Sequence, residues 1–565
     1  MSTQVKKRRG TSAEHDAFTG ATGEITVNTS TNGIRVHDGI TVGGRAIGDD
    51  DQLALAAGSP TQRKMKDRFA DVVNVRDFGA VGDADTGSPT DDTTNINNAI
   101  AYCRSLIVTL PNPDQDYIPV KLVFPKGAYS VSTLDFTEIV GPRNFQVDFQ
   151  GSVLIGNTVG KTVIDLTGSR WIWFHNVLVN SLESTICKSG IQLGPVGTET
   201  CGNNKFFNVQ CLGNYSEAAF SNYGSETTQY YSCRFSNNNS SAGSYSYRGD
   251  GLNLNGYSSD YVTVTRSIGQ AVSFTNNYFY SCQLRSLNAG RSVFLSQTNG
   301  WNFDQGCYFL TFTGAAVVMY GTGTYRNEGI TLRGLFETTQ SPGIDHCVEF
   351  TGDGTQTSIN AFTLDTVRPH AQLSYIKNSV GNSVSLPNCD IKITNPVSGK
   401  TPDFFDVGSG LSAWGVIKTA YPEGLNLGDL TNFSGQIIVD DLNVIASLPA
   451  AGSAYTAIGS SGGYIQGGKK QEYQDTWQTV TIASNNVTPV YEFSTISSTS
   501  LETVNTITAS YSGAQKVTFR FSGTGSVTFT NNTSFIRNNS GADVVLTANQ
   551  TVTYIRVSGD IWQEV

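Results

Sequence analysis

Residues 70–104 hold the segment that most constrains the fold of this chain. A short apolar run there ends at turns containing Gly79 and Gly82, and a polar spacer follows. Asp91 and Asp92 are favourable helix N-caps. Apolar side chains then recur at helical spacing on one face, at Ile96, Ala99, Ile100 and Cys103. Hardly another helical pattern follows, so the helix is suited to capping the open end of a β-stack.

An aromatic strand-and-turn pattern repeats in the middle of the chain. Its spacing is often about 25 residues, which fits one turn of a solenoid that carries three short strands. Such coils bury their apolar faces by stacking on their neighbours. The longer interval 235–277 predicts a loop leaving the stack, where sugar-binding side chains often lie. The repeating segments are 205–213, 230–235, 277–282, 306–310, 333–337 and 361–365.

These patterns predict an all-β protein of four parts. Residues 1–68 form a small N-terminal module with little core of its own, which we expect to depend on oligomerisation or a partner. Residues 69–405 form a parallel β-helix with its capping helix. Residues 406–475 form a connecting β region. Alternating apolar residues between Gly and Asn turns predict an antiparallel β-sandwich-like domain over 476–565.

Composition excludes several functional classes. Charged residues make up only 15% of the chain, whereas 59 glycines accompany many small polar residues, which fits stacked strands with outward hydroxyls and amides. The net charge of −10 argues against a nucleic-acid partner. No apolar run reaches the roughly 18 residues that span a bilayer, so no membrane insertion is predicted. The N-terminus lacks an apolar signal region, which predicts synthesis in a cytoplasm and release by another route.

The cysteines and histidines do not predict a metal or redox centre. The nine cysteines form no CxxC pair, and we expect them to be small hydrophobic residues of the solenoid interior rather than disulfide or catalytic groups. The five histidines are scattered along the chain, so no metal site and no cofactor are predicted. His175 lies in a very apolar run and is predicted to be a hydrogen-bonded core residue.

Two stretches resemble phage proteins. The wording Val-Arg-Asp-Phe-Gly-Ala-Val-Gly-Asp at 75–83, followed by Asp-Asp-Thr and Ile-Asn-Asn-Ala-Ile, resembles the entry to the pectate-lyase-like, right-handed parallel β-helix of phage tailspikes. Upstream, residues 6–24 and 35–44 are similar to the N-terminal module of phage tail-fibre and receptor-binding proteins. The ending 557–565 resembles tailspike C-terminal β-domains, which hold trimers together or bind carbohydrate.

The resemblance implies a homotrimeric tailspike carried on the virion. It implies that the N-terminal module binds a phage tail or baseplate protein, and that the chain is made in the host cytoplasm. It also implies that the β-helix binds and depolymerises a bacterial surface polysaccharide, either capsule or O-antigen.

A pair of carboxylates is the leading candidate for the chemistry. Glycan hydrolysis needs one carboxyl to protonate the leaving oxygen and another to activate water or attack the sugar. Aligning 335–338 with 363–366 brings Glu337 and Asp365 to matching positions on neighbouring coils, where close like charges would raise one pKa. Asp304 is a third candidate, one coil earlier.

The alternatives for these residues are structural. A carboxylate at a solenoid turn often caps backbone amides, and 47 acidic residues are available. Asp250, Asp260, Asp345 and Glu349 are weaker catalytic candidates. The predicted substrate-binding residues are Arg333, Arg368, His370 and Trp301. The alternatives are that the basic residues are ordinary surface residues without a role in binding, and that Trp301 stacks inside the solenoid, as aromatic residues more often do.

Hydrolysis is the preferred reaction, and three other functions stay open. A lyase would need a base such as Lys, Arg, His or Tyr and a group that neutralises the substrate carboxylate. A receptor-binding fibre would use the same β-helix without catalysis. An esterase that removes acetyl groups is disfavoured, since no Ser-His-Asp arrangement stands out.

Overall fold

The structure is a computed structural model, and it describes most of the chain. The described residues are 7–47, 53–108, 120–197, 201–286, 291–337, 345–394, 403–420, 433–439, 455–458, 463–467, 478–489, 493–508 and 516–565, with short gaps inside several of these ranges. No helix among the described residues is long and apolar enough to cross a membrane.

The N-terminal module is a four-stranded sheet covered on one face by a short helix. The sheet order is β1 (Arg8–Gly10), β2 (Ile25–Asn28), β3 (Gly33–Val36) and β4 (Arg45–Ile47). Helix α1 (Ser12–Asp16) begins at a capping box formed by Thr11 and Glu14. A separate hairpin follows, built from β5 (Leu53–Leu55) and β6 (Gln62–Lys64).

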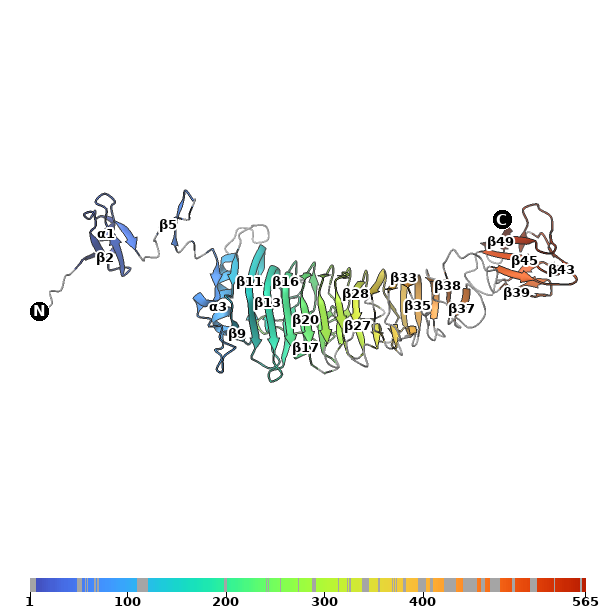
Figure 1. The fold of residues 1–565 in the computed structure, drawn as a ribbon, viewed down its shortest axis with the longest axis horizontal. Helices are drawn as coiled ribbons and strands as arrows, with labels where there is room; N and C mark the ends of the chain where they lie inside the picture. The colour runs from blue at the N-terminus through green and yellow to red at the C-terminus, as the bar shows by residue number, and fades with distance from the viewer. Residues whose placement is uncertain are drawn as a thin grey trace.

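The predicted capping helix is present at the entry to the solenoid. Helix α3 (Thr93–Val108) follows β7 (Val73–Asn74) and the 3-10 turn η1 (Val75–Phe78), and it lies at the N-terminal end of the solenoid (Figure 1). The carboxylate of Asp92 accepts the backbone N–H groups of Val81 and Gly82 at 2.7 and 3.1 Å, so it ties the turn to the start of the helix. The four predicted apolar residues of the helix face are fully buried: Ile96, Ala99, Ile100 and Cys103.

Parallel strands from successive coils build one side of the solenoid as a ten-stranded sheet, which we call sheet 1. Each strand pairs in parallel with the next coil, the pattern expected of a β-helix. Its strands are β10 (Leu134–Asp135), β12 (Ile164–Asp165), β14 (Cys187–Leu193), β17 (Tyr215–Asn222), β21 (Tyr245–Asp250), β24 (Arg291–Ser296), β27 (Ala315–Gly321), β29 (His346–Gly352), β32 (Ser374–Asn378) and β34 (Asp403–Asp406).

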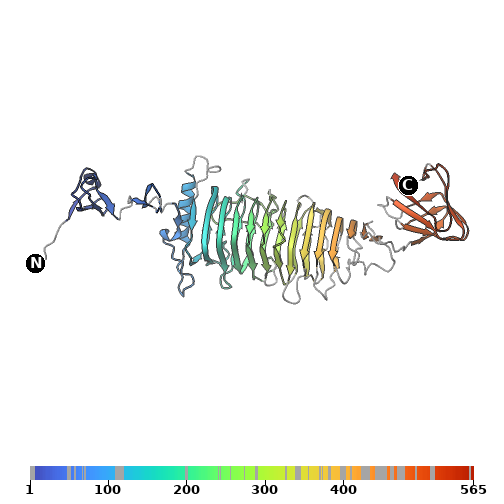
Figure 2. The same cartoon turned by 45° about the horizontal axis from the view of Figure 1, so that its top comes forward.

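The opposite side, sheet 2, contains two strand segments in most coils. Figure 2 shows strands of successive coils side by side along the solenoid. The two segments are joined at bend residues with positive φ, among them Asn176, Asn208 and Ser281. The strands are β8 (Lys121–Val123), β9 (Ala128–Val131), β11 (Val140–Gly156), β13 (Arg170–Ser181), β15 (Cys201–Gly202), β16 (Lys205–Gly213), β18 (Ser225–Glu226), β19 (Gln229–Tyr231), β20 (Arg234–Asn237), β22 (Tyr278–Tyr280), β23 (Gln283–Ser286), β25 (Asn302–Phe303), β26 (Tyr308–Leu310), β28 (Thr331–Glu337), β30 (Gln356–Ser358), β31 (Phe362–Val367) and β33 (Ser383–Thr394).

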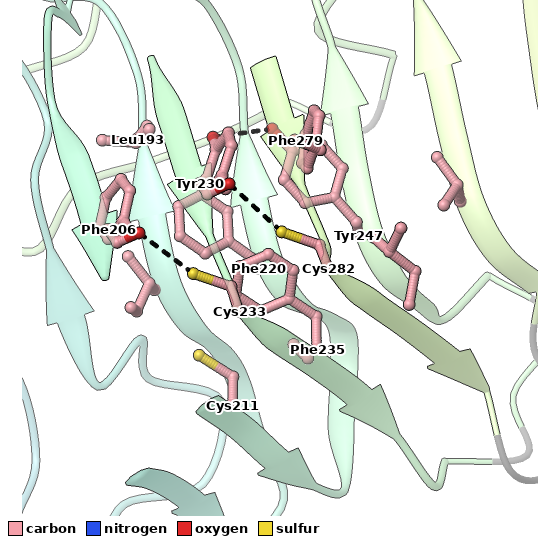
Figure 3. Packing of buried hydrophobic residues seen from close by; sticks show 14 of the residues in the cluster. Leu193, Phe206, Cys211, Phe220, Tyr230, Cys233, Phe235, Tyr247, Phe279 and Cys282 are labelled. Carbon is pink, nitrogen blue, oxygen red and sulfur yellow. Dashed lines mark hydrogen bonds between the residues drawn. The ribbon is translucent and has the colours of Figure 1, made fainter. Parts of the chain in front are cut away.

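Aromatic rings stack along the inside of sheet 2 (Figure 3). Phe279 lies between Tyr230 and Phe303, with ring centroids 4.4 and 4.1 Å apart and nearly parallel planes. Phe206 precedes them, 5.3 Å from Tyr230. All four rings are fully buried, so each coil buries its aromatic side chain against the coils before and after it.

All nine cysteines are buried and free, as predicted. Cys233 and Cys282 donate weak hydrogen bonds to the backbone oxygens of Phe206 and Tyr230, one coil earlier (Figure 3). Burial raises the pKa of Cys211 and Cys282 well above the usual value of 9.0. These thiols are small core residues and poor nucleophiles.

Parallel pairing continues beyond residue 405, where the sequence pattern predicted the β-helix to end. Strands β35 (Leu411–Ala420) and β36 (Phe433–Val439) extend sheet 2, and β38 (Gly463–Gly467) pairs with β36 and, in antiparallel fashion, with β37 (Tyr455–Ile458). These strands hold only single aromatic residues, such as Trp414 in β35 and Phe433 in β36, and no adjacent aromatic pair like Tyr230 and Tyr231 marks them in the sequence.

The C-terminal strands form mixed sheets around a separate core. Pairs such as β42–β45 are parallel, whereas β45–β49 and β49–β50 are antiparallel, so the antiparallel arrangement that the sequence predicted holds for only some of the strand pairs. The strands are β39 (Gln478–Val480), β40 (Ile482–Ala483), β41 (Asn486–Val487), β42 (Phe493–Ile496), β43 (Leu501–Val504), β44 (Thr506–Ile507), β45 (Lys516–Phe521), β46 (Ser526–Phe529), β47 (Ile536–Arg537), β48 (Val544–Leu546), β49 (Thr551–Ser558) and β50 (Ile561–Glu564).

The long loop after β21 lies back across the outside of sheet 1. Ser259 donates a hydrogen bond to Asp165 at 2.7 Å, and Asp260 forms a 2.6 Å ion pair with Lys161. Tyr261 reaches the capping region, where its hydroxyl donates to the backbone oxygen of Thr133 at 2.8 Å. The prediction of a loop that leaves the stack was therefore wrong for residues 257–261, which strap earlier coils together.

Candidate functional site

Four charged residues from successive coils share one outward-facing column of sheet 2. Arg333 is opposite Asp365, and Asp365 is opposite Lys392. Phe303 is opposite Leu332, which places Asp304 one coil before Arg333. We call Asp304, Arg333, Asp365 and Lys392 the charged column.

Asp365 lies at the centre of the charged column and is only partly accessible. Its side chain is 15% exposed, and its Oδ1 lies 3.7 Å from Lys392 Nζ. Its Oδ2 accepts a 3.3 Å hydrogen bond from Gln305 Nε2, which reaches across two coils. The residue is therefore held in one orientation by a cation and an amide, as a group that acts on a bound substrate must be.

Asp304 occupies a turn between the two segments of sheet 2. Its Oδ1 accepts the backbone N–H groups of Ser281 and Gly306 at 2.9 and 3.0 Å. One carboxylate oxygen of Asp304 therefore caps backbone amides of a turn, which is the structural role considered as the alternative to catalysis. The side chain remains half-exposed on the face that carries Asp365.

Glu337 does not lie opposite Asp365, so the predicted register was wrong by four residues. It lies opposite Leu310, in the second segment of sheet 2. The slip keeps every inward residue inward, because four is an even number of residues and the side-chain period of a strand is two. The predicted pairing of Glu337 with Asp365 was therefore consistent with the alternation of inward and outward residues, although the register was wrong.

A second polar group surrounds Glu337. Burial raises the pKa of Tyr308, and the neighbouring Glu337 carboxylate raises it further. Arg285 lies near enough to oppose this shift, and desolvation together with Arg285 lowers the pKa of Arg234. Sheet 2 thus carries a carboxylate, a phenol and two guanidinium groups beside the charged column.

The predicted substrate-binding residues have different outcomes. Arg333 is exposed and lies in the charged column. Trp301 is fully buried, with its ring packed edge-on against Phe274 at 4.6 Å, so its assignment to sugar binding was wrong. Arg368 and His370 lie outside the described residues.

The weaker acidic candidates are engaged in structural contacts. Asp250 is fully buried and accepts hydrogen bonds from Arg248 and Ser296, both at 2.8 Å. Glu349 is largely buried and pairs with Arg291 at 3.3 Å. Asp260 anchors the strap across sheet 1, and Asp345 accepts the backbone N–H of Gly314 at 2.9 Å.

An aromatic column on the outside of sheet 2 was missed by the sequence analysis. Phe207 stacks on His175 at 4.7 Å and on Tyr231 at 4.8 Å, and Tyr231 stacks on Tyr280 at 4.8 Å. His175 is therefore a half-buried outer residue and was wrongly predicted to be in the core. Adjacent aromatic pairs such as Tyr230 and Tyr231 were the available signal, because one ring of each pair must face outward.

The aromatic column is not a platform for a sugar ring. Its planes are within about 11° of parallel, at the strand spacing, so each ring covers the faces of its neighbours. A sugar that stacks on an aromatic side chain needs a free ring face. The stacked rings instead form a rigid part of the outer surface of sheet 2. Asp304 continues this column, because it lies one coil after Tyr280.

No group of three or more His, Cys, Asp or Glu side chains among the described residues is arranged to hold a metal ion.

Comparisons with known proteins identify both ends of the chain. Residues 5–41 match the family described as the major tropism determinant N-terminal domain. Residues 473–563 match the family described as the phage depolymerase C-terminal beta sandwich domain. A tail fiber receptor-binding protein of Bordetella phage BPP-1 is 50% identical over 56 residues, which is 10% of this chain. The match spans only 15% of the length of that curated relative.

Solved structures similar to the chain include tailspikes and a pectate lyase. Tailspike protein 2 of Escherichia coli O157:H7 bacteriophage CAB120 is 12% identical, with a TM-score of 0.36, over 84% of this chain and 57% of its own. A tailspike of Escherichia coli bacteriophage HK620 is 12% identical, with a TM-score of 0.36, over 84% of each chain. Pectate lyase Pel9A is 12% identical, with a TM-score of 0.26, over 61% of this chain and 71% of its own.

The fold itself is established by the strand pairing described above. An N-terminal domain of one phage family and a C-terminal domain of another are joined by a parallel β-helix, which is the arrangement that the resemblance implied. The chain thus carries a region similar to the major tropism determinant N-terminal domain at one end and a region similar to the phage depolymerase C-terminal beta sandwich domain at the other.

Proposed function

We propose that this tailspike binds and depolymerises a bacterial surface polysaccharide, capsule or O-antigen, by glycosidic hydrolysis at the charged column. The observation that carries the proposal is that Asp304 and Asp365 lie on one outward face with Arg333 between them. Parallel strands are about 4.8 Å apart, so the backbones of these two residues are roughly 10 Å apart. Inverting hydrolysis uses carboxyl groups roughly 6.5–9.5 Å apart, a separation that the two side chains can reach.

The residues of the column have distinct tasks in this proposal. Asp304 and Asp365 supply the acid and the base, and the sugar and its attacking water lie between them above Arg333. Arg333 and Lys392 bind hydroxyl or carboxylate groups of the glycan, which suits an acidic polysaccharide. Glu337, with Tyr308, binds the substrate beside the reacting bond and is not the partner of Asp365.

We propose the same virion context that the family matches support. The N-terminal module holds the protein on the phage tail or baseplate, the protein acts as a homotrimer, and it is made in the host cytoplasm. The polysaccharide is the receptor, and cleaving it brings the particle to the cell surface.

A second candidate reaction is β-elimination from a uronic-acid polymer. It is favoured by the two cations on either side of Asp365, which would neutralise a uronate carboxylate. The products distinguish the two reactions, because elimination leaves an unsaturated sugar that absorbs ultraviolet light and hydrolysis does not.

The test uses the purified full chain and purified capsule and O-antigen polysaccharides from a panel of strains. We expect one polysaccharide to be shortened on a sizing column, with new reducing ends and without a rise in ultraviolet absorbance. A rise in absorbance would replace hydrolysis by elimination. Binding to a polysaccharide whose chain length stays unchanged would show a non-catalytic receptor-binding fibre and would refute the proposal.

A further inference from the structure

Two arginines on the outer face of sheet 2 lie outside the charged column. Arg234 is on strand β20, and Arg285 is on strand β23 of the next coil. The residues that follow and precede them in their strands, Phe235 and Leu284, are fully buried. Because successive side chains of a strand point to opposite faces, both arginines point outward. We call Arg234 and Arg285 the arginine pair.

The two side chains of the arginine pair are diagonal neighbours on this face. Arg285 lies opposite Ser236, which is two residues along the strand from Arg234. Strands of neighbouring coils are about 4.8 Å apart and each residue advances about 3.3 Å, so the two Cα atoms are roughly 8 Å apart. Partial burial lowers the pKa of Arg234, and the positive charge of Arg285 lowers it further. The two guanidinium groups are therefore close enough to repel each other.

The side chains around the arginine pair carry no compensating charge. The sequence has no Asp or Glu over 229–244 or over 278–292, the two segments that contain the pair. The residues opposite the pair in the neighbouring coils are uncharged as well. They are Gln210 and Gln283 on either side of Arg234, and Ser236 and Leu310 on either side of Arg285.

Both guanidinium groups consequently lack a counter-charge from the protein. In the part of the chain that the structure describes, neither side chain forms an ion pair or a hydrogen bond, and the Nε of each is buried without an acceptor. Two adjacent cations that are partly desolvated are stabilised by an added anion. The planar fork of donors on arginine matches the oxygens of a carboxylate or a phosphate. The arginine pair is therefore suited to binding such a group.

The arginine pair lies beside the candidate reaction site. Tyr308 is opposite Gln283, so the coil that carries Asp304 and Tyr308 directly follows the coil of Arg285. Arg285 and Arg234 are thus one and two coils before Asp304, roughly 5 and 10 Å along the axis of the solenoid. A glycan that follows this axis beyond Asp304 reaches both guanidinium groups.

We propose that the arginine pair is a subsite for an anionic group of the polysaccharide, either the carboxylate of an acidic sugar or a phosphate ester. This inference rests on the proposed function, and it narrows the substrate to a glycan that carries negative charge. Each guanidinium donates hydrogen bonds to one oxygen of the anion, so one bound anion compensates both cations. The charged column acts on the reacting sugar, and the arginine pair holds a charged unit one or two coils away.

The test measures the binding of small sugars to the full chain by saturation-transfer NMR titration. The probes are D-glucuronate, D-glucose 6-phosphate and D-glucose, which share a sugar ring and differ in the charged group. Arg234→Gln and Arg285→Gln each remove one guanidinium group of the pair. Arg9→Gln is the matched control, because Arg9 is an exposed arginine on strand β1 of the N-terminal module.

We expect the parent protein to bind at least one of the two charged sugars more tightly than D-glucose. Tighter binding of D-glucuronate identifies a carboxylate, and tighter binding of D-glucose 6-phosphate identifies a phosphate. Either variant of the pair should weaken this binding by about tenfold or more, the effect of losing a hydrogen bond between charged groups. Arg9→Gln should leave it unchanged.

Two results would overturn the inference. The first is that neither charged sugar binds more tightly than D-glucose. The second is that both variants of the arginine pair bind the charged sugar as tightly as the parent does. If circular dichroism shows that one variant fails to fold, the other variant carries the test.

Polysaccharide cleavage by the same proteins separates this inference from the proposed function. A parent protein that cleaves a polysaccharide and binds neither charged sugar would refute only the arginine subsite. A parent protein that binds a charged sugar through the pair and cleaves no polysaccharide would refute only the enzymatic proposal.

Discussion

In this protein, the β-helix and the N-terminal module place their apolar residues on opposite sides. In the β-helix, aromatic rings such as Phe279 fill the interior, and the outer face of sheet 2 carries charged side chains and one aromatic column. In the module, imidazole and hydroxyl groups fill the interior, and Ile34 and Ile47 face outward. The comparison teaches that a long stack supplies its own core, whereas a sheet of four short strands has too little volume for an apolar core and uses buried hydrogen bonds instead.

The largest expected effect comes from opening the core of the β-helix. Phe279→Ala should lower the free energy of unfolding by about 3–5 kcal/mol, because it leaves a cavity between two stacked rings. Tyr280→Ala is the matched control, one residue along and half-exposed on the outer face. Thermal unfolding followed by circular dichroism measures both. Equal losses would break the distinction between the two faces of sheet 2.

A smaller loss is expected from the polar core of the module. Thr26→Val removes the hydroxyl shared by His15 and His37 and leaves two buried imidazole nitrogens unpaired. Each orphaned group costs about 1–3 kcal/mol. Limited proteolysis at the N-terminal module should become faster, while the β-helix keeps its melting temperature. Thr22→Val, at an exposed threonine, is the control and should leave the proteolysis rate unchanged.

The smallest effect concerns pH. Burial raises the pKa of Asp165 above 3.8, so folding favours its protonated form; that contribution to stability is complete below pH 3.8 and is lost as the pH rises through the raised pKa. In the module, backbone N–H groups of the Thr41 turn hold the pKa of Asp38 below 3.8, so its contribution is present above pH 3.8 and is lost as the pH falls.

Asp165→Asn should therefore gain stability relative to the parent protein at pH 7 and lose that advantage at pH 4. Asp38→Asn should show its deficit at pH 7, and the deficit should shrink in acid. The measurement is the melting temperature of the parent protein and of both variants at pH 7 and at pH 4. If each variant differed from the parent by the same melting-temperature change at pH 7 and at pH 4, the directions of the two pKa shifts would be contradicted.

Much of the fold could be predicted because local patterns determine it. The helix face from Ile96 to Cys103 and the buried cysteines follow from side-chain spacing and are confirmed. Trp301 could not be placed by composition, because aromatic residues occur on both sides of sheet 2. The direction of the C-terminal strands depends on long-range pairing that alternation does not record.

The candidate site could be predicted only in part. No residue type common to all coils marks the bend between the two segments of sheet 2: Gly334 in β28 has a positive φ of 136°, whereas Asn208 and Ser281 have φ values of 51° and 53° at the bends of earlier coils. In the structure, Arg333 before this bend pairs with Asp365. The sequence prediction instead paired Glu337 with Asp365, because it aligned the similar segments 335–338 and 363–366. The alternation of apolar and polar residues could predict that Asp304 and Asp365 face outward. It could not predict that the two residues lie in the same column, because that depends on the register between coils.

The most direct test of the account compares polysaccharide cleavage by Asp304→Asn and Asp365→Asn with that by Asp390→Asn, an exposed carboxylate one column away, opposite Thr363. Each protein is brought to saturation with the same polysaccharide, so that binding is matched and chain length is read over time. The account predicts that either column variant slows cleavage by 100-fold or more, on the order of a lost acid or base, while Asp390→Asn keeps the parent rate. Parent rates in both column variants would contradict it.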